Sequence, residues 1–342
     1  MPRYAVYVLS RPALPLARSL GNELDASIHA PSRFAEAGIH GFDSLRELLE
    51  TTFARFDGHV FIAAAGIVVR TIAPLLGSKD SDPAVVAMDP EGRFVISLLS
   101  GHLGGANELA RRCAKTTGGT PVITTATDSA GVVSMDMLAS ERGLHIADLG
   151  EVKAINAALL EGRAVRVYDP LGCLGELDAA AFRRVDRPED LAREEPGVWV
   201  YWREGAPGPG LLRLRPPVLT LGVGCRRGTP REEILGLILR VLEENGLARE
   251  SVAAMGTADI KRDEQGILEA ARELGLPLKF YTAEELAAVA APTPSSMVER
   301  HVGTPGVCEA AALLLGEGGE LLVAKQKTER VTVAVARRKT CS

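Results

Sequence analysis

The stretch ISLLSGHLGGANELARRCA, residues 96–114, passes from an apolar run through a glycine-rich turn into a helical pattern. The apolar run ends at Ser100 and predicts a strand, and the residues from the alanine after the glycines onward predict a helix. A strand joined to a helix in this way is the building unit of an α/β domain with a largely parallel sheet. His102 lies inside the turn, and Asn107 and Glu108 follow on the first turn of the helix.

The same alternation of short apolar runs and helical patterns continues along the chain. Strands are predicted at YAVYVLS, HVFIAAA and PVITTA, while AVVAMD and FVISLLS flank the turn PEG and predict a hairpin. A capping box of Ser44 and Glu47 opens a predicted helix, SLRELLETTFARF. We therefore expect an α/β protein of several domains, with open, largely parallel sheets flanked by helices.

Three segments are predicted. Residues 1–134 form an N-terminal α/β domain with the SGHLGGAN loop, and residues 135–212 a small middle domain that ends in the Gly- and Pro-rich linker REGAPGPGLLRLRPP. Residues 217–338 form a separate α/β C-terminal domain, which closes with a hairpin around KTER. In it, Thr229 is the predicted N-cap of a helix whose first residue is Pro230.

Composition excludes several classes of protein. The 342 residues are 46% apolar and 24% charged, with a net charge of -5, so the chain has no general attraction to nucleic acid or to anionic membranes. Five cysteines without CxxC spacing fit a reducing cytoplasm better than a disulfide framework or a zinc site. The N-terminus lacks the apolar region of a signal peptide, and no apolar run approaches the length of a membrane span, so we expect a cytoplasmic protein.

Three glycine-rich turns precede predicted helices: LLSGHLGGANE, LGVGCRRGTPREE and VERHVGTPGVCEAA. The first N–H groups of a helix have no partner inside it, and the helix dipole favours a carboxylate or phosphate there. None of the turns has the spacing of a P-loop or of a Rossmann turn. We expect a small molecule with several negative charges, bound by Lys79, Ser100, Gly101, Gly104, Gly105, Asn107, Arg226, Arg227, Thr229, His301 and Thr304.

Three residues are candidates for catalysis. Histidine is a side chain suited to proton transfer near neutral pH, so His102 can act as a general base or acid, or it can be a loop histidine that bonds to backbone. Asp128 in TTATDSAG follows a predicted strand and can face the same cleft, or it can belong to a polar turn. Glu108 can bind ligand or simply favour the helix dipole. Neither Cys225 nor Cys308 has the surroundings expected of a nucleophile, and no cluster has the spacing of metal ligands.

Long stretches of the sequence resemble the cobalt-precorrin-5A hydrolase family of anaerobic cobalamin biosynthesis. The resemblance lies in residues 66–110, in SGHLGGAN followed by PVITTATD, and in LGVGCRRGTPREEI with GTPGVCEAAALLL. It implies that water opens the ring A δ-lactone of cobalt-precorrin-5A, that the C20 two-carbon unit leaves as acetaldehyde, and that cobalt-precorrin-5B is formed. It also implies no cofactor of the protein's own, because cobalt arrives with the tetrapyrrole substrate.

With this reaction in mind, we expect His102 to be the general base, with Asp128 or Glu108 orienting it or the water. The amide groups of Gly104 and Gly105 are the expected oxyanion donors. Carboxylates of the substrate are expected to bind Lys79, Arg226 and Arg227. A non-catalytic carrier of a corrinoid intermediate and a nucleotide-dependent enzyme are the rival hypotheses. A homodimer and transient contacts with neighbouring pathway enzymes stay open.

Overall fold

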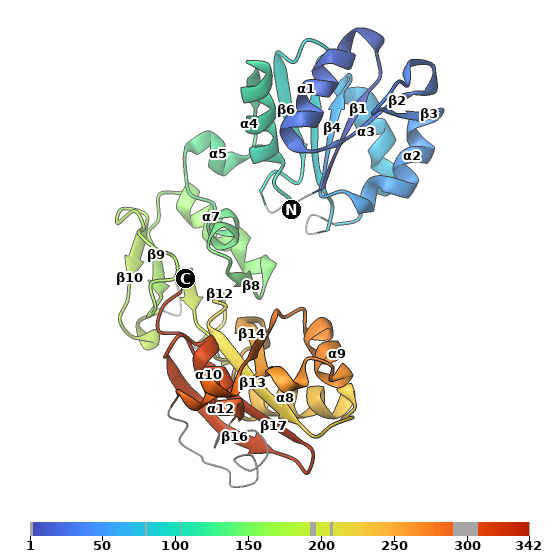
Figure 1. Cartoon of the computed structure of the whole chain (residues 1–342). Helices are drawn as coiled ribbons and strands as arrows, with labels where there is room; N and C mark the ends of the chain where they lie inside the picture. Colours follow the sequence, from blue (N-terminus) through green and yellow to red (C-terminus); the bar gives the residue numbers. More distant parts are fainter. Residues whose placement is uncertain are drawn as a thin grey trace. The chain divides into compact units, whose positions relative to one another are not determined.

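The structure is a computed structural model that describes residues 3–78, 81–102, 104–191, 196–205, 208–289 and 307–341. The chain divides into two compact units, Met1–Met137 and Leu138–Ser342. The first unit contains one β-sheet and the second contains two (Figure 1). The predicted class, α/β with several largely parallel sheets flanked by helices, is confirmed. The predicted domain boundaries stay a prediction.

The first sheet has seven strands in the order β3-β2-β1-β4-β5-β6-β7. The strands from β3 to β5 run parallel, β6 runs antiparallel to β5, and β7 is parallel to β6. The predicted hairpin of β5 and β6 is therefore confirmed, and strand direction reverses there. The carboxyl ends of β6 and β7 consequently lie at the edge where β5 begins. The strands are β1 Tyr4–Val8, β2 Ser27–Pro31, β3 His40–Phe42, β4 Gly58–Ile62, β5 Ala84–Met88, β6 Phe94–Leu99 and β7 Thr120–Val122.

Helices cover both faces of this sheet (Figure 1). Strand residues such as Val60 pack with Leu20 of α1 and Leu109 of α4, while their neighbours, such as Phe61, pack with Leu49 of α2. Strands that are buried on both faces explain the nearly continuous apolar runs in the sequence. The Ser44 side chain accepts a hydrogen bond from the Glu47 amide, as predicted. The helices are α1 Leu14–Leu24, α2 Leu45–Thr52, α3 Ala65–Ile72, α4 Ala106–Thr117, α5 Ala126–Ala130 and α6 Met135–Glu141.

The second unit begins with a five-stranded sheet in the order β10-β9-β11-β12-β8, packed against α7. The prediction of a linker over REGAPGPGLLRLRPP is wrong for Leu211–Arg215, which forms the strand β12. This strand pairs with both β11 and β8, and its leucines are buried, so packing outweighs the neighbouring Gly and Pro residues. The elements are α7 Leu149–Leu160, β8 His145–Ile146, β9 Val165–Tyr168, β10 Phe182–Arg184, β11 Gly197–Val200 and β12.

The C-terminal sheet has the order β15-β14-β13-β17-β16, in which β13, β14 and β15 are parallel and β16 and β17 form the predicted hairpin. Thr282 and Glu285 form a capping box at the start of α10. Pro230, and not Thr229, is the N-cap residue of α8. The elements are β13 Leu219–Cys225, α8 Arg231–Glu244, β14 Val252–Ala258, α9 Gln265–Leu274, β15 Leu278–Tyr281, α10 Ala283–Ala287, α12 Val307–Leu315, β16 Glu320–Lys327 and β17 Val331–Arg337.

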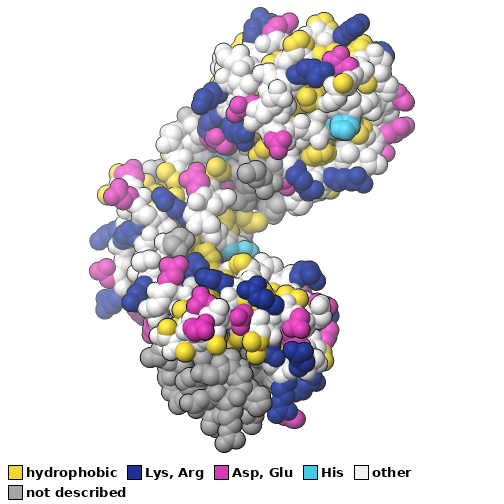
Figure 2. Space-filling view, in the orientation of Figure 1, with side chains coloured by type: hydrophobic (Ala, Val, Ile, Leu, Met, Phe, Trp, Pro, Cys, Tyr) yellow, Lys and Arg dark blue, Asp and Glu magenta, His cyan; other side chains and the backbone are white. Residues whose placement is uncertain are grey.

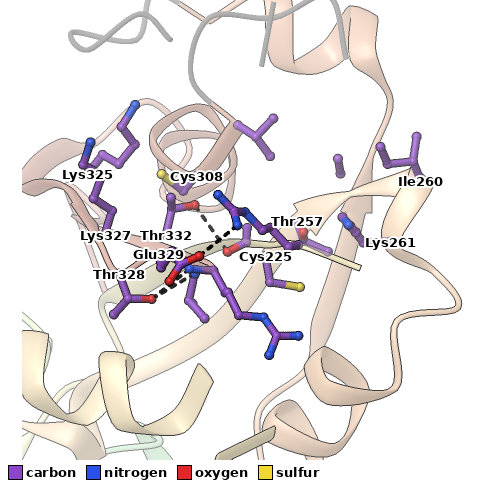
Figure 3. A pocket seen from close by; sticks show the side chains of 16 residues that line it. Cys225, Thr257, Ile260, Lys261, Cys308, Lys325, Lys327, Thr328, Glu329 and Thr332 are labelled. Carbon is purple, nitrogen blue, oxygen red and sulfur yellow. Dashed lines mark hydrogen bonds and ion pairs between the residues drawn. The ribbon is translucent and has the colours of Figure 1, made fainter. Parts of the chain in front are cut away.

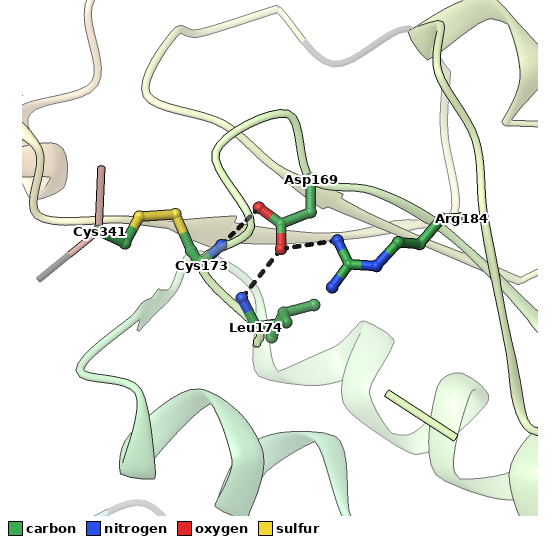
Figure 4. Close-up of a disulfide and its surroundings, with 5 residues drawn as sticks. All are labelled: Asp169, Cys173, Leu174, Arg184 and Cys341. Atoms are coloured by element: carbon green, nitrogen blue, oxygen red, sulfur yellow. Dashed lines mark hydrogen bonds and ion pairs between the residues drawn. A yellow bond between two sulfur atoms is a disulfide. The ribbon is translucent and has the colours of Figure 1, made fainter. Parts of the chain in front are cut away.

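A disulfide joins Cys173 to Cys341 inside the second unit (Figure 4). The cysteine spacing predicted no disulfide, and this prediction is wrong for the pair, whose partners are 168 residues apart. The loop that carries Cys173 is held by Asp169, whose buried carboxylate accepts hydrogen bonds from the amides of Cys173 and Leu174. Cys113, Cys225 and Cys308 are free thiols.

The surface carries mixed charges. On the visible face in Figure 2, Lys and Arg side chains are interspersed with Asp and Glu side chains. A mixed surface of this kind fits the absence of a general attraction to polyanions that the net charge indicates. In the part of the chain that the structure describes, no helix combines the length and apolar character needed to cross a bilayer.

Candidate functional site

The turn between β6 and α4 has a backbone that two glycines make possible. Gly105 has a φ of +82°, a conformation that favours glycine. At Gly104 a Cβ atom would lie 2.3 Å from the Cβ of Ser100, so a larger residue would force the turn open. Ser100 itself has a φ of 56°, which is uncommon for a residue with a side chain. These constraints explain why small residues surround His102.

Hydrogen bonds within the turn use several of its polar groups. The amides of Gly105, Ala106 and Asn107 donate to the carbonyls of His102, Ser100 and Gly101 at 2.8, 3.0 and 3.0 Å. The N–H of Gly105 is thus engaged within the turn, and its predicted role as an oxyanion donor stays a prediction. Of the predicted pair, Gly104 is left as the candidate donor. The Ser100 hydroxyl, predicted to bind substrate, instead donates to the carbonyl of Asp82 at 2.9 Å, just before β5.

The His102 ring lies between two carboxylates. Its Nε2 atom is 3.1 Å from Oδ2 of Asp128 and 3.0 Å from the hydroxyl of Thr127. Its Nδ1 atom is 3.3 Å from Oδ2 of Asp136 and 3.5 Å from the hydroxyl of Ser134. Only 10% of the side chain is exposed. Both ring nitrogens are thus in contact with side chains that can exchange a proton with them or fix the tautomer.

Asp128 is the centre of a hydrogen-bond network. Its carboxylate accepts hydrogen bonds from Thr125 Oγ1 at 2.6 Å, from Asn107 Nδ2 at 2.8 Å and from Arg111 at 2.5 Å. Partial burial raises the pKa of Asp128, but the hydrogen bonds from Thr125, Arg111 and His102 outweigh this effect, so the pKa lies below its ordinary range. Asp128 is therefore a carboxylate at neutral pH, and it contacts the Nε2 side of His102; its predicted role in orienting the ring stays a prediction.

Asn107 and Glu108 differ from the predictions made for them. Asn107 is 1% exposed, and its amide bridges Ser97, Thr125 and Asp128, so it supports Asp128 and is not available to substrate. Glu108 has a side chain that is 62% exposed and lies 3.8 Å from Arg111. Because Glu108 faces solvent and not the ring, it cannot orient His102 in this conformation.

The sequence did not predict several residues of the site, among them Arg111, Ser134 and Asp136. Arg111 follows Asn107 by four residues, so both lie on one face of α4, and helical spacing could have identified it. Ser134 and Asp136 are buried, and the Ser134 hydroxyl donates to the Asp136 carboxylate. Ser134 precedes α6 and Asp136 lies in its first turn, and the helical pattern of this segment does not show that it lies beside the turn of His102.

The predicted residues of the C-terminal domain belong to a second location. The Thr229 hydroxyl donates to the Arg226 carbonyl at 2.7 Å, and the Gly228 amide donates to the Glu264 carboxylate at 2.6 Å. An internal carboxylate thus occupies the Gly228 amide in this turn. Arg226 lies 3.3 Å from Glu329, and Arg227 is exposed.

The predicted residues Lys79, His301 and Thr304 lie outside the described residues. Within the part of the chain that the structure describes, no group of three or more His, Cys, Asp or Glu side chains is arranged to hold a metal ion.

Three family models match successive parts of the chain. They are described as cobalamin synthesis G N-terminal, cobalamin biosynthesis central region and cobalamin synthesis G C-terminus, and they match residues 47–128, 133–216 and 219–336. The first match includes His102 and Asp128, and the second begins just before Ser134.

Curated relatives extend the match to nearly the whole chain. Cobalt-precorrin-5A hydrolase of Priestia megaterium is 34% identical, over 97% of this chain and 94% of the relative. The protein of the same name from Salmonella typhimurium is also 34% identical, over 97% of this chain and 96% of the relative. Protein CobE of a Sinorhizobium species is 38% identical over 34% of this chain and 79% of its own length. The chain therefore belongs to the cobalt-precorrin-5A hydrolase family.

Proposed function

We propose that this protein hydrolyses cobalt-precorrin-5A to cobalt-precorrin-5B and acetaldehyde. Two full-length relatives with that name support the reaction. The observation that carries the proposal is the buried contact of His102 with carboxylates on both ring nitrogens, at a glycine turn that ends a strand. Such a group can move protons in a place that is largely shielded from solvent.

The chemistry needs several proton transfers. Water adds to the lactone carbonyl, the ring C–O bond breaks, and the products are a carboxylate and a hydroxyl on the two-carbon unit. That hydroxyl then loses its proton and becomes the carbonyl of acetaldehyde. The electron pair of the broken C–C bond moves into the macrocycle, which takes up a proton. One proton-transfer residue can accept a proton in the first step and return one in the last.

In this proposal His102 transfers the proton and Asp128 positions it. Asp128 fixes the Nε2 side of the ring and is itself held by Arg111 and Asn107. The Nδ1 side, toward Ser134 and Asp136, is then the side that exchanges its contact for the reacting water or hydroxyl. The Gly104 amide is the proposed donor to the oxyanion of the tetrahedral intermediate.

Acetaldehyde release tests the proposal. Purified protein is incubated with cobalt-precorrin-5A, and the aldehyde is trapped and quantified. We expect turnover by the wild type and by His145→Ala, a control at an exposed histidine, and loss of turnover in His102→Ala. If His102→Ala released acetaldehyde as fast as the active control His145→Ala, His102 would have no role in the mechanism. Substrate bound tightly without acetaldehyde would indicate a carrier.

The proposal includes no cofactor of the protein's own, since the cobalt arrives in the substrate, and it places the reaction in the cytoplasm. Full activity after dialysis against a chelator would support the first point. Activity that is lost on dialysis and restored by a metal salt would contradict it.

A further inference from the structure

A threonine hydroxyl and a serine hydroxyl lie beside the His102 ring. The Thr127 hydroxyl is 3.0 Å from Nε2, and the Ser134 hydroxyl is 3.5 Å from Nδ1. All three residues belong to the first compact unit, so these contacts lie within one unit. A hydroxyl next to an imidazole that also contacts a carboxylate is the arrangement of an activated nucleophile, and the distance from nucleophile to base is often longer before substrate binds.

Ser134 is the better placed of these hydroxyls. The Asp128 carboxylate lies 3.1 Å from Nε2, so Thr127 shares that nitrogen with an anion. An ionised carboxylate favours a proton on the nitrogen that it contacts. The Nδ1 side of the ring is then the side that exchanges protons, and Ser134 lies on that side.

Asp136 completes a base beside the Ser134 hydroxyl. Its Oδ1 atom accepts the hydrogen bond from Ser134, and its Oδ2 atom lies 3.3 Å from Nδ1 of His102. Because the carboxylate and the ring contact each other and the same hydroxyl, a proton that leaves Ser134 can pass to the pair of Asp136 and His102. A serine hydroxyl needs such a base, since it is a weak nucleophile without one.

The Ser134 hydroxyl is shielded from bulk water and yet close to the surface. Ser134 is 7% exposed, and the side chain of His102 is 10% exposed. Val133, the residue before Ser134, is an apolar residue that is 44% exposed. A substrate that contacts Val133 is therefore one residue away from the hydroxyl, and the shielding would protect a reactive intermediate from side reactions with bulk water.

The free thiols are less suited to attack a carbonyl carbon. Cys225 and Cys308 line a cavity of about 570 Å³ in the C-terminal domain (Figure 3). Burial raises the pKa of Cys225, and it raises the pKa of Cys308 to about 11. Burial also raises the pKa of Cys113, in the core of the first unit, to about 12. The reactive thiolate form is therefore scarce at neutral pH for all three.

We propose that Ser134 is the nucleophile that opens the lactone, and that the reaction passes through an ester of Ser134. The substrate in this inference rests on the proposed function, whereas the choice of nucleophile rests on the contacts around His102. Direct attack of water on the lactone is replaced by two successive attacks on the same carbonyl carbon, first by Ser134 and then by water.

Bonds and protons balance over the two steps. First, Ser134 Oγ bonds to the lactone carbonyl carbon, its proton passes to the pair of Asp136 and His102, and the ring C–O bond breaks. The alkoxide formed on the two-carbon unit takes up that proton. Water then attacks the ester, a proton of the water passes to the same pair, and the Ser134 oxygen leaves and takes it. The products are the carboxylate and the hydroxyl that precede the loss of acetaldehyde.

A fluorophosphonate tests the nucleophile without any tetrapyrrole, because it phosphonylates an activated serine hydroxyl. The full-length protein is treated with the reagent, and the modified residue is identified by mass spectrometry. We expect Ser134 to be modified in the wild type and in Ser140→Ala, a control at an exposed serine of α6. Modification of Ser134 should be at least about 10²-fold slower in His102→Ala. Labelling of the wild type needs no variant, so it is informative even where a substitution unfolds the protein.

Cobalt-precorrin-5A gives a second readout. Ser134→Ala, shown to be folded by circular dichroism, should release acetaldehyde at least about 10³-fold more slowly than Ser140→Ala. Wild-type protein quenched in acid during turnover should carry an adduct on Ser134. Its added mass should equal that of the substrate, or that of the substrate less acetaldehyde. A purely structural role of Ser134 would give no such adduct.

Two results would overturn the inference. One is an unmodified Ser134 under conditions that label a serine protease, and the other is a folded Ser134→Ala protein that releases acetaldehyde at the wild-type rate. The proposed function fails separately. A phosphonylated Ser134 without acetaldehyde release would contradict the proposed reaction and keep the reactive serine, whereas acetaldehyde release with an unreactive Ser134 would leave water as the nucleophile.

Discussion

Asp128→Asn removes the charge at the centre of the His102 network and keeps the shape of the side chain. The carboxylate accepts from Arg111, Asn107 and Thr125 and contacts His102, and it is 20% exposed. An amide turns its NH₂ group toward one of these donors, so at least one hydrogen bond involving a charged group is lost, which is worth about 1.5–3 kcal/mol. We expect the free energy of unfolding to fall by about 2 kcal/mol in urea titrations at pH 7.

The same substitution should lower the rate of acetaldehyde release by about 10²- to 10³-fold, because His102 loses the partner that positions its ring. The pKa of Asp128 is lowered by folding, so its stabilising effect is present above the pKa of the unfolded chain. That effect disappears as the pH falls through the folded-state pKa, and the stability difference between wild type and variant should vanish there.

Asp25→Asn, at an exposed carboxylate of the same unit in a backbone conformation that asparagine tolerates, is the control. A folded Asp128→Asn protein that keeps activity within threefold of wild type would refute the positioning role. If Asp25→Asn lost as much activity as Asp128→Asn, the loss would not be specific to the hydrogen-bond network around His102.

Three further outcomes are expected. Gly104→Ala should destabilise the protein and reduce activity, because the new Cβ atom would collide with Ser100. A variant with the melting temperature and turnover of the wild type would contradict this description of the turn. Acidification from pH 7 to 5 should lower the free energy of unfolding by about 2 kcal/mol through His59, because burial lowers its pKa to about 4 and the unfolded chain takes up the proton first. His59→Gln should show a shallower pH dependence of stability, measured by denaturant titration. Reduction of the Cys173–Cys341 disulfide should lower the melting temperature, because the unfolded chain gains conformational entropy. The free energy of unfolding should fall by at most about 5 kcal/mol. A reductant should leave the melting temperature of Cys341→Ser unchanged.

Much of the fold was predictable because each strand and helix has its own periodic pattern. Both hairpins and the helix starts at Ser44 and Thr282 follow from local turn and capping chemistry. The strand β12 was not predictable from the same rules. Its leucines are stabilised by strands and helices distant in sequence, whereas the local density of Gly and Pro indicated a linker.

The sequence could indicate the site residues that come after two neighbouring strands. His102 comes after β6 and Asp128 after β7, and these parallel neighbours bring the two residues together at one edge. Asp136 reaches the other side of the ring from the first turn of α6, and a helical pattern alone does not show which loop that turn contacts. The role of Asn107 depends on its burial, which a residue on the first turn of a helix does not reveal in the sequence. The partner of Cys173 is remote in the chain and carries no local signal.

The reversal of strand direction between β5 and β6 has a practical use. The hairpin turn at residues 89–93 lies at the end of β6 opposite Ser100 and the His102 ring. Glu91 in that turn has a side chain that is 64% exposed, and it forms a surface ion pair with Arg93. A fluorophore or a solid support attached there would leave the end of the strand that carries His102 untouched, so binding and turnover could be followed on the same labelled sample.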